Sequence, residues 1–220
     1  MKKFLILLTL AGAMTSASHA QMLITGIIDG PRTGGNPKAI ELYASEDIAD
    51  LSLWDVQYYF NATATPGVTV TLAGSASAGD YIYVASETTE FEAYFGFAPT
   101  FTGGGSVNGD DSVVLRLNAT DVDVYGSPGT DGTGQPWEYL DTWSYRNNGT
   151  TASTTWEAAD WSSPGINALD PLGATGVNPA AGDPLHMPIG TYAVPEPSTY
   201  ALLGLGAAGL GAHIIRRRRR

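Results

Sequence analysis

The last 27 residues determine how much of this chain is left to form a water-soluble fold. Behind Val194-Pro195-Glu196-Pro197, the run Ser198–Ile215 has eighteen residues and no charged side chain. As a helix it would be ~27 Å long at ~1.5 Å per residue, which is about the thickness of a bilayer core. Its leucine, alanine and glycine residues fall on every side, so no polar face remains for water. The sequence therefore predicts a single membrane helix at the carboxyl end.

Five consecutive arginines end the sequence: Arg216, Arg217, Arg218, Arg219 and Arg220. Basic residues beside a membrane helix stay on the cytoplasmic side, because they cross the bilayer with difficulty. This cluster is therefore the predicted cytoplasmic anchor. The residues before the helix are predicted to lie on the outer side of the membrane.

A Pro-Glu-Pro block, a short apolar helix and a terminal arginine cluster together resemble the PEP-CTERM sorting signal of Gram-negative bacteria. The resemblance covers Val194–Arg220, and its motif residues are Val194, Pro195, Glu196 and Pro197. It implies processing by an exosortase, a membrane enzyme that recognises this block, removes the tail and releases or re-anchors the product. The implied location is an inner-membrane precursor, followed by the cell surface or the extracellular matrix.

The amino end carries a second addressing segment. Lys2-Lys3, the apolar run Phe4–Ala13 and the small-residue pattern Ser18-His19-Ala20 predict a signal peptide that is cut before Gln21. The Sec export machinery and signal peptidase are the expected partners. The predicted order is then a signal peptide (1–20), a folded domain (21–163), a linker (164–193) and the sorting signal (194–220). The linker is predicted to be flexible because prolines and glycines are frequent in it and aromatic residues are rare.

Between Gln21 and Ala193 the charge is strongly negative. Only four basic residues face 21 acidic ones there, which gives a net charge of −17. Such a surface repels phosphate backbones, so no nucleic-acid partner is expected. The chain has no cysteine, so disulfides and cysteine-ligated metals are excluded.

Short runs of valine, isoleucine, tyrosine and threonine alternate with glycine, proline and asparagine clusters, which is typical of an all-β sandwich. Strands are predicted at Met22–Ile28, Ala39–Tyr43, Leu51–Phe60, Val68–Leu72, Tyr81–Ala85, Ser112–Leu117, Val122–Tyr125 and Tyr139–Tyr145.

Two local patterns are specific enough to place side chains. Val113, Leu115 and Leu117 alternate with Val114 and Arg116, so the first three are expected on the core face of a strand. Asn118-Ala119-Thr120 should close a hairpin to the next strand. Asp121 and Asp123 are expected on the solvated face of the next strand. One short helix is predicted from a capping box at Thr89 and Glu92, ends at Gly96 and should plug one end of the sandwich.

Several segments of the domain resemble bacterial lamin-tail-like (LTD) domains. These segments are Leu23–Gly30, Lys38–Tyr43, Asn108–Leu115, Val122–Gly126 and Gly134–Arg146. The resemblance covers roughly Met22–Asn167. It implies an immunoglobulin-like β-sandwich that acts as a non-catalytic module.

Histidine is too scarce to support most hydrolytic mechanisms. His19 leaves with the signal peptide and His213 lies in the membrane run, so His186 in the linker is the only one left. A catalytic triad or a zinc site needs histidine on a rigid element, and the predicted domain has none. The alternative is a hydrolase that acts on polysaccharide through two carboxylates, Glu138 and Asp141, beside nearby tryptophans. The expected function is a non-catalytic binding or structural module.

Calcium is the candidate cofactor, because this ion prefers carboxylate and carbonyl oxygens. The candidate ligands are Asp110, Asp111, Asp121, Asp123 and Asp131. A calcium-dependent adhesin that binds extracellular polysaccharide is the corresponding function. The competing interpretation, which the sequence favours, places these aspartates on a solvated strand face and in a turn.

Overall fold

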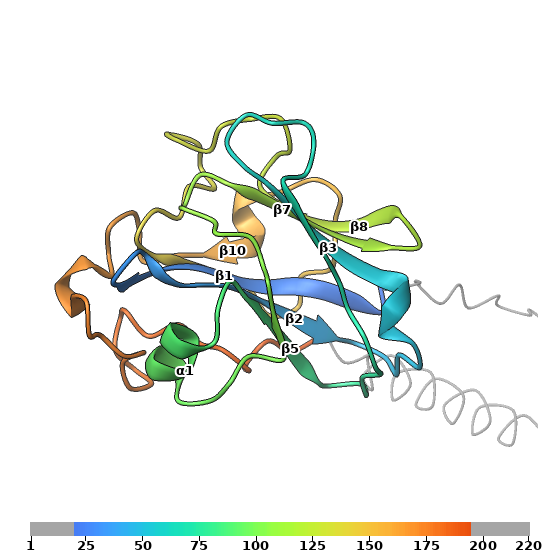
Figure 1. The fold of residues 1–220 in the computed structure, drawn as a ribbon, viewed down its shortest axis with the longest axis horizontal. Helices are drawn as coiled ribbons and strands as arrows, with labels where there is room; N and C mark the ends of the chain where they lie inside the picture. Colours follow the sequence, from blue (N-terminus) through green and yellow to red (C-terminus); the bar gives the residue numbers. More distant parts are fainter. Residues whose placement is uncertain (1–19, 195–220) are drawn as a thin grey trace, which may run out of the picture.

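A computed structural model describes residues 20–194, and these residues form two β-sheets that pack face to face (Figure 1). The first sheet has six strands in the order β10-β9-β1-β2-β5-β6, and the second has four in the order β4-β3-β7-β8. All neighbouring strands are antiparallel except β5 and β6. The predicted all-β sandwich is therefore confirmed.

The strand bounds are as follows. The six-stranded sheet contains β1 (Met22–Arg32), β2 (Asn36–Ala44), β5 (Tyr81–Ala85), β6 (Phe101–Thr102), β9 (Trp143–Arg146) and β10 (Trp161–Ser162). The four-stranded sheet contains β3 (Trp54–Tyr59), β4 (Val68–Thr71), β7 (Ser112–Leu117) and β8 (Thr120–Tyr125). The helical elements are α1 (Thr89–Phe95) and three 3-10 turns, η1 (Leu51–Leu53), η2 (Ala158–Asp160) and η3 (Asp170–Leu172).

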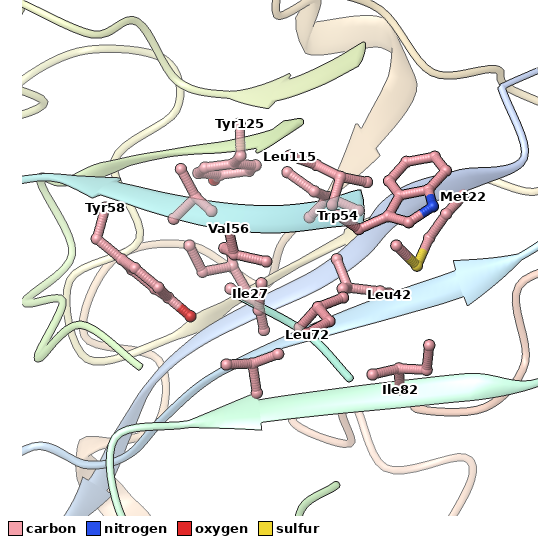
Figure 2. Packing of buried hydrophobic residues seen from close by; sticks show 14 of the residues in the cluster. Met22, Ile27, Leu42, Trp54, Val56, Tyr58, Leu72, Ile82, Leu115 and Tyr125 are labelled. Atoms are coloured by element: carbon pink, nitrogen blue, oxygen red, sulfur yellow. The ribbon is translucent and has the colours of Figure 1, made fainter. Parts of the chain in front are cut away.

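The main core fills the space between the two sheets (Figure 2). Ile27 and Leu42 reach it from the six-stranded sheet, and Val56 and Leu115 reach it from the four-stranded sheet. All four are at most 1% exposed. Burying an aliphatic side chain of this size stabilises a fold by about 1.5–3 kcal/mol, so the alternation of apolar residues along these strands specifies the sandwich.

A second core covers the other face of the six-stranded sheet. Leu23, Ile28 and Tyr145 point to this side, and Phe91 of α1 and Met187 pack on them. The molecule thus has three layers, with the six-stranded sheet in the middle (Figure 1). This arrangement explains why β1 is buried along most of its length, because it has a core on each side.

The hairpin between β7 and β8 has the predicted position. Leu117 pairs with Thr120 across a two-residue turn in which Asn118 and Ala119 have φ of 49° and 60°. Two successive positive φ values match a type I′ turn, whose twist suits an antiparallel pair. Val113 and Leu115 lie in the main core, as expected.

The helix also occupies its predicted position, but it begins and packs differently. The Glu87 carboxylate accepts from the amide of Glu90, and Thr88 and Thr89 make no side-chain cap. Gly96 ends the helix in the left-handed conformation, as predicted. The helix lies on the outer face of the six-stranded sheet and not at one end of the sandwich, because Phe91 and Tyr94 complete the second core.

The segment predicted to be a flexible linker, 164–193, packs along the same outer face. Leu169, Met187 and Tyr192 are at most 2% exposed, and all three belong to the second core. Here the prolines and glycines form a series of turns between buried anchors, and η3 is one of these turns. The prediction of a flexible linker is therefore wrong. It was based on the proline and glycine content, whereas three buried apolar side chains hold the segment on the sheet.

The predicted signal peptide, Pro195-Glu196-Pro197, the membrane helix and the arginine cluster lie outside the described residues, apart from Ala20. Within residues 20–194, the structure contains no helix with the length and apolar character needed to cross a bilayer.

Candidate functional site

The five aspartates predicted to bind calcium do not converge. Asp111 and Asp123 are buried, whereas Asp121 and Asp131 are exposed. Asp131 and Asp110 lie close enough for the charge of one to act on the other. Across residues 20–194, no three histidine, aspartate or glutamate side chains form a group that could hold a metal ion. The carboxylates instead have identifiable roles within the fold.

Asp123 was expected on a solvated face, but it is fully buried in an ion pair with Arg146. A bulge in β8 explains the difference: Leu115 pairs with Asp123 and Arg116 pairs with Asp121, so one extra residue shifts the alternation of side chains. Asp123 consequently points inward, on the same face as Tyr125, while Asp121 stays in solvent.

The buried ion pair connects the two sheets. The Arg146 Nη2 lies 2.7 Å from one Asp123 oxygen and 2.8 Å from the other. The amides of Ile24 and Ser153 also donate to this carboxylate, and Arg146 Nε donates to the Ile24 carbonyl at 2.6 Å. Burial raises the pKa of Asp123 to about 6, while Arg146 acts in the opposite direction. Both Asp123 oxygens accept hydrogen bonds from the fold. Asp123 therefore joins the two sheets and is not free to bind a metal ion.

Asp111 has a similar structural role just before β7. Its two oxygens accept from the amides of Asn61 and Asn108, which ties two loops together. Asp131 accepts from the Thr133 amide in a local turn. Burial, and secondarily the charge of Asp131, raise the pKa of Asp110. These contacts are typical of aspartates that order loops.

Glu138 and Asp141, the carboxylates of the hydrolase alternative, are not hydrogen-bonded to each other among the described residues. The Glu138 carboxylate accepts from the Gly134 amide at 2.7 Å and so closes its own loop. Asp141 sits at a positive φ of 46°, and its amide donates to Asp29. The Glu138 carboxylate and the Asp141 amide therefore make their hydrogen bonds to different parts of the fold.

Glu41 is a further buried carboxylate, which no sequence pattern singled out. It is 1% exposed, and no cation contacts it among the described residues. Its oxygens accept from Thr25 Oγ1 at 2.6 Å, the Tyr145 hydroxyl at 2.7 Å and the Gly190 amide at 2.7 Å. Burial raises the pKa of Glu41, and the hydrogen bonds from Thr25 and Tyr145 oppose that rise. Through Gly190, this carboxylate attaches the carboxyl-terminal segment to β2.

The carboxyl-terminal segment is held at several further points. The Tyr145 hydroxyl accepts from the amides of Thr191 and Tyr192, and Trp143 Nε1 donates to the Leu185 carbonyl. Met187 fits against Gly26, where an added Cβ would lie 2.7 Å from its Cε. Glycine at position 26 therefore gives the segment space to lie on β1.

The described chain leaves the domain at a fixed point. The Ala193 amide donates to Asn148 Oδ1 at 2.9 Å, and the Gly149 amide donates to the Ala193 carbonyl at 3.0 Å. The Tyr192 hydroxyl also donates to the Thr150 carbonyl. Val194 packs on the second core, so the fold extends to the last described residue. Figure 1 shows the segment along the outer face.

The surface formed by residues 20–194 includes two grooves that bear on function. One of about 190 Å³ lies beside the chain exit, between Trp143, Asn148, Pro188 and Thr191. The other, of about 350 Å³, is lined by Val124, Gly126, Ser127, Pro128, Trp137, Thr154, Thr155 and Trp156. No charged side chain lines this second groove, and neither Glu138 nor Asp141 belongs to it.

Comparison with known proteins identifies one part of the chain. No curated protein and no solved structure matches it significantly. Residues 193–220 match the PEP-CTERM protein-sorting motif. This match supports the predicted processing by exosortase, and it implies a precursor that is exported, passes through the membrane and is processed at its carboxyl end. The match begins at Ala193, so the sorting motif starts within the last two residues of the described fold.

Proposed function

We propose that this protein is an exported, non-catalytic β-sandwich module, which exosortase processing delivers to the surface of a Gram-negative cell or to its extracellular matrix. The observation that carries the proposal is the junction at Ala193, where an ordered domain passes directly into a sorting motif. We also propose that the sandwich is lamin-tail-like. Its two packed sheets and the sequence segments quoted above support that assignment.

The polar groups that are buried in the domain support a non-catalytic role. Asp111, Asp123 and Glu41 are each engaged by several donors from the fold, so none is free to exchange a proton with a substrate. His186 lies next to the Pro179 carbonyl in the carboxyl-terminal segment. A binding or structural function needs no reactive side chain and is consistent with this distribution.

Two measurements test the proposal. The intact mass of the protein recovered outside the cell should lack Arg216–Arg220 and most of the apolar run. Recovery of the full-length chain there would contradict processing. A screen over polysaccharides, esters and nucleic acids should show no turnover. Turnover that Glu138→Gln or Asp141→Asn abolishes would favour the hydrolase alternative.

As a second and more specific proposal, the groove at Trp156 binds a neutral sugar of an extracellular polysaccharide. Aromatic rings beside Ser127 and Thr155 hydroxyls offer both an apolar surface and hydrogen-bonding groups, and an uncharged lining gives no attraction to ions. The Trp156 Nε1 is buried without a hydrogen-bond partner among the described residues. Titration with neutral oligosaccharides should quench tryptophan fluorescence, and Trp156→Phe should weaken that binding. An unchanged affinity in the variant would contradict the assignment.

A further inference from the structure

We propose that the surface around the chain exit is the face of the domain that contacts the membrane-bound processing enzyme. We call it the exit face and define it as Asn147–Thr151 together with Pro188–Ala193. The inference rests on the exosortase processing proposed above. It adds that the enzyme contacts the folded domain as well as the Pro-Glu-Pro block.

Chain length limits how far the domain can lie from the membrane. Only Val194–Pro197 separate Ala193 from Ser198, where the apolar run begins. Five peptide steps cover at most about 18 Å, whatever conformation these residues take. The headgroup layer occupies roughly 5–8 Å of that distance. About 10–13 Å therefore remains, which is close to the diameter of one helix with its side chains.

The fold does not provide extra length before Ala193. Tyr192 is 2% exposed, and the bonds from Ala193 to Asn148 and Gly149 fix the exit to the loop after β9. The part of an enzyme that binds the Pro-Glu-Pro block must therefore fit between the domain and the membrane surface, in a space about one helix wide. Its outer surface then touches the exit face.

The charge distribution of the domain is consistent with close contact there. No acidic residue occurs between Asp141 and Glu157, or between Asp183 and Glu196, although the domain as a whole carries −17. Arg146 is the only basic residue in these two stretches, and it is 2% exposed and paired with Asp123. The centres of protein interfaces are depleted of charge, and an uncharged face also avoids repulsion from anionic lipid.

The exit face also has a shape that a partner can use. The groove of about 190 Å³ lies directly beside it, and its lining includes Trp143, Pro188, Asn147 and Asn148 together with Arg146, whose charge is paired with Asp123. A protein side chain can enter this groove and meet an apolar wall and hydrogen-bonding groups together. A smooth lipid surface has no corresponding feature.

A charge-matched pair of variants tests the proposal in the full-length chain. Thr151 and Thr191 are exposed on the exit face, whereas Thr69 and Thr71 are exposed on β4 in the other sheet. In a Gram-negative host that carries an exosortase, we compare Thr151→Glu/Thr191→Glu with Thr69→Glu/Thr71→Glu by pulse-chase. We expect the first variant to be processed about tenfold more slowly or worse, because a contact would bury unpaired carboxylates. The second should match the wild type. Melting temperatures verify that both variants fold.

A longer tether provides the internal control. Ten glycine and serine residues inserted between Val194 and Pro195 should restore the processing rate of the exit-face variant, because the domain then lies away from the enzyme. Equal processing of the two glutamate variants at native spacing would overturn the inference while leaving the proposed function intact. A wild-type chain that is not cut would refute both.

Photo-crosslinking identifies the contact directly. A crosslinking residue at position 151 of the full-length chain should capture the exosortase, and one at position 69 should not. Adducts to lipid alone from position 151 would assign the exit face to the membrane and would overturn the proposal.

Discussion

Replacing Tyr145 with phenylalanine should release the carboxyl-terminal segment without unfolding the sandwich. The Tyr145 hydroxyl donates to Glu41 and accepts from the amides of Thr191 and Tyr192. The ring itself is 4% exposed and packs in the second core, so phenylalanine keeps the packing and removes only these three hydrogen bonds.

The magnitude depends on which partners water can reach after the substitution. Thr191 is exposed, so its amide can form a hydrogen bond to water instead, and this replacement costs little free energy. The Glu41 oxygen that Tyr145 contacts keeps its hydrogen bond from Thr25 Oγ1. The buried amide of Tyr192 loses its partner, and a buried group without a partner costs about 1–3 kcal/mol. The segment is thus destabilised by roughly 1–3 kcal/mol, which increases its opening about 5- to 150-fold.

Amide hydrogen exchange measures that opening. The amides of Gly190 and Tyr192 should exchange faster by this factor, while those of β7 should change little. Tyr59→Phe is the matched control, because its hydroxyl bonds only to Gln57 on β3 of the other sheet. Equal exchange at Tyr192 in the wild type and in Tyr145→Phe would refute the argument that this hydroxyl holds the segment.

Three further predictions concern charge. Burial raises the pKa of both Asp29 and Asp123 to about 6, so the folded state binds their protons more tightly than the unfolded state does. Their contribution to stability is then fully present below about pH 4 and is lost as the pH rises through 6, so the melting temperature should be higher at pH 5 than at pH 7. A lower value at pH 5 would contradict this assignment. In urea denaturation, Arg146→Met should cost about 3–5 kcal/mol because Asp123 remains buried and unpaired, whereas Arg116→Met, at a partly exposed pair, should cost about 1 kcal/mol or less. Equal losses would show that burial of the pair is unimportant. Calcium should raise the melting temperature no more than magnesium at equal ionic strength, and a calcium-specific rise would restore the calcium-site hypothesis.

The elements that sequence predicts best are those whose signals are local. The β7–β8 hairpin and the end of α1 at Gly96 depend on residues within one turn, and both lie where the sequence places them. Alternation along β7 likewise identifies Val113 and Leu115 as core residues. Such patterns act through backbone geometry and through burial on one face, which a single segment determines.

The features that sequence analysis missed depend on contacts between distant segments. The bulge that turns Asp123 inward is visible only once β8 is paired with β7, and the residue it meets, Arg146, is 23 positions away. The two-residue strands β6 and β10 exist because neighbouring strands offer free edges. Glu41 is buried because the segment around Gly190 covers it from 149 positions away.

The pairing of the domain's four basic residues limits which partners its surface can attract. All four are paired with acidic residues, and each pair joins different parts of the fold: Arg32 with Glu90, Lys38 with Asp29, Arg116 with Asp55 and Arg146 with Asp123. Within residues 20–194, no positive charge is therefore left over to attract an anionic partner, and most of the surface repels one. Contacts with other macromolecules are then easiest where charge is absent. The groove at Trp156 meets that condition, and the exit face has no acidic residue within its two segments. The exit face lies where the sorting motif begins, which is why we propose it as the contact for processing, and the groove at Trp156 lies in the domain that precedes this motif.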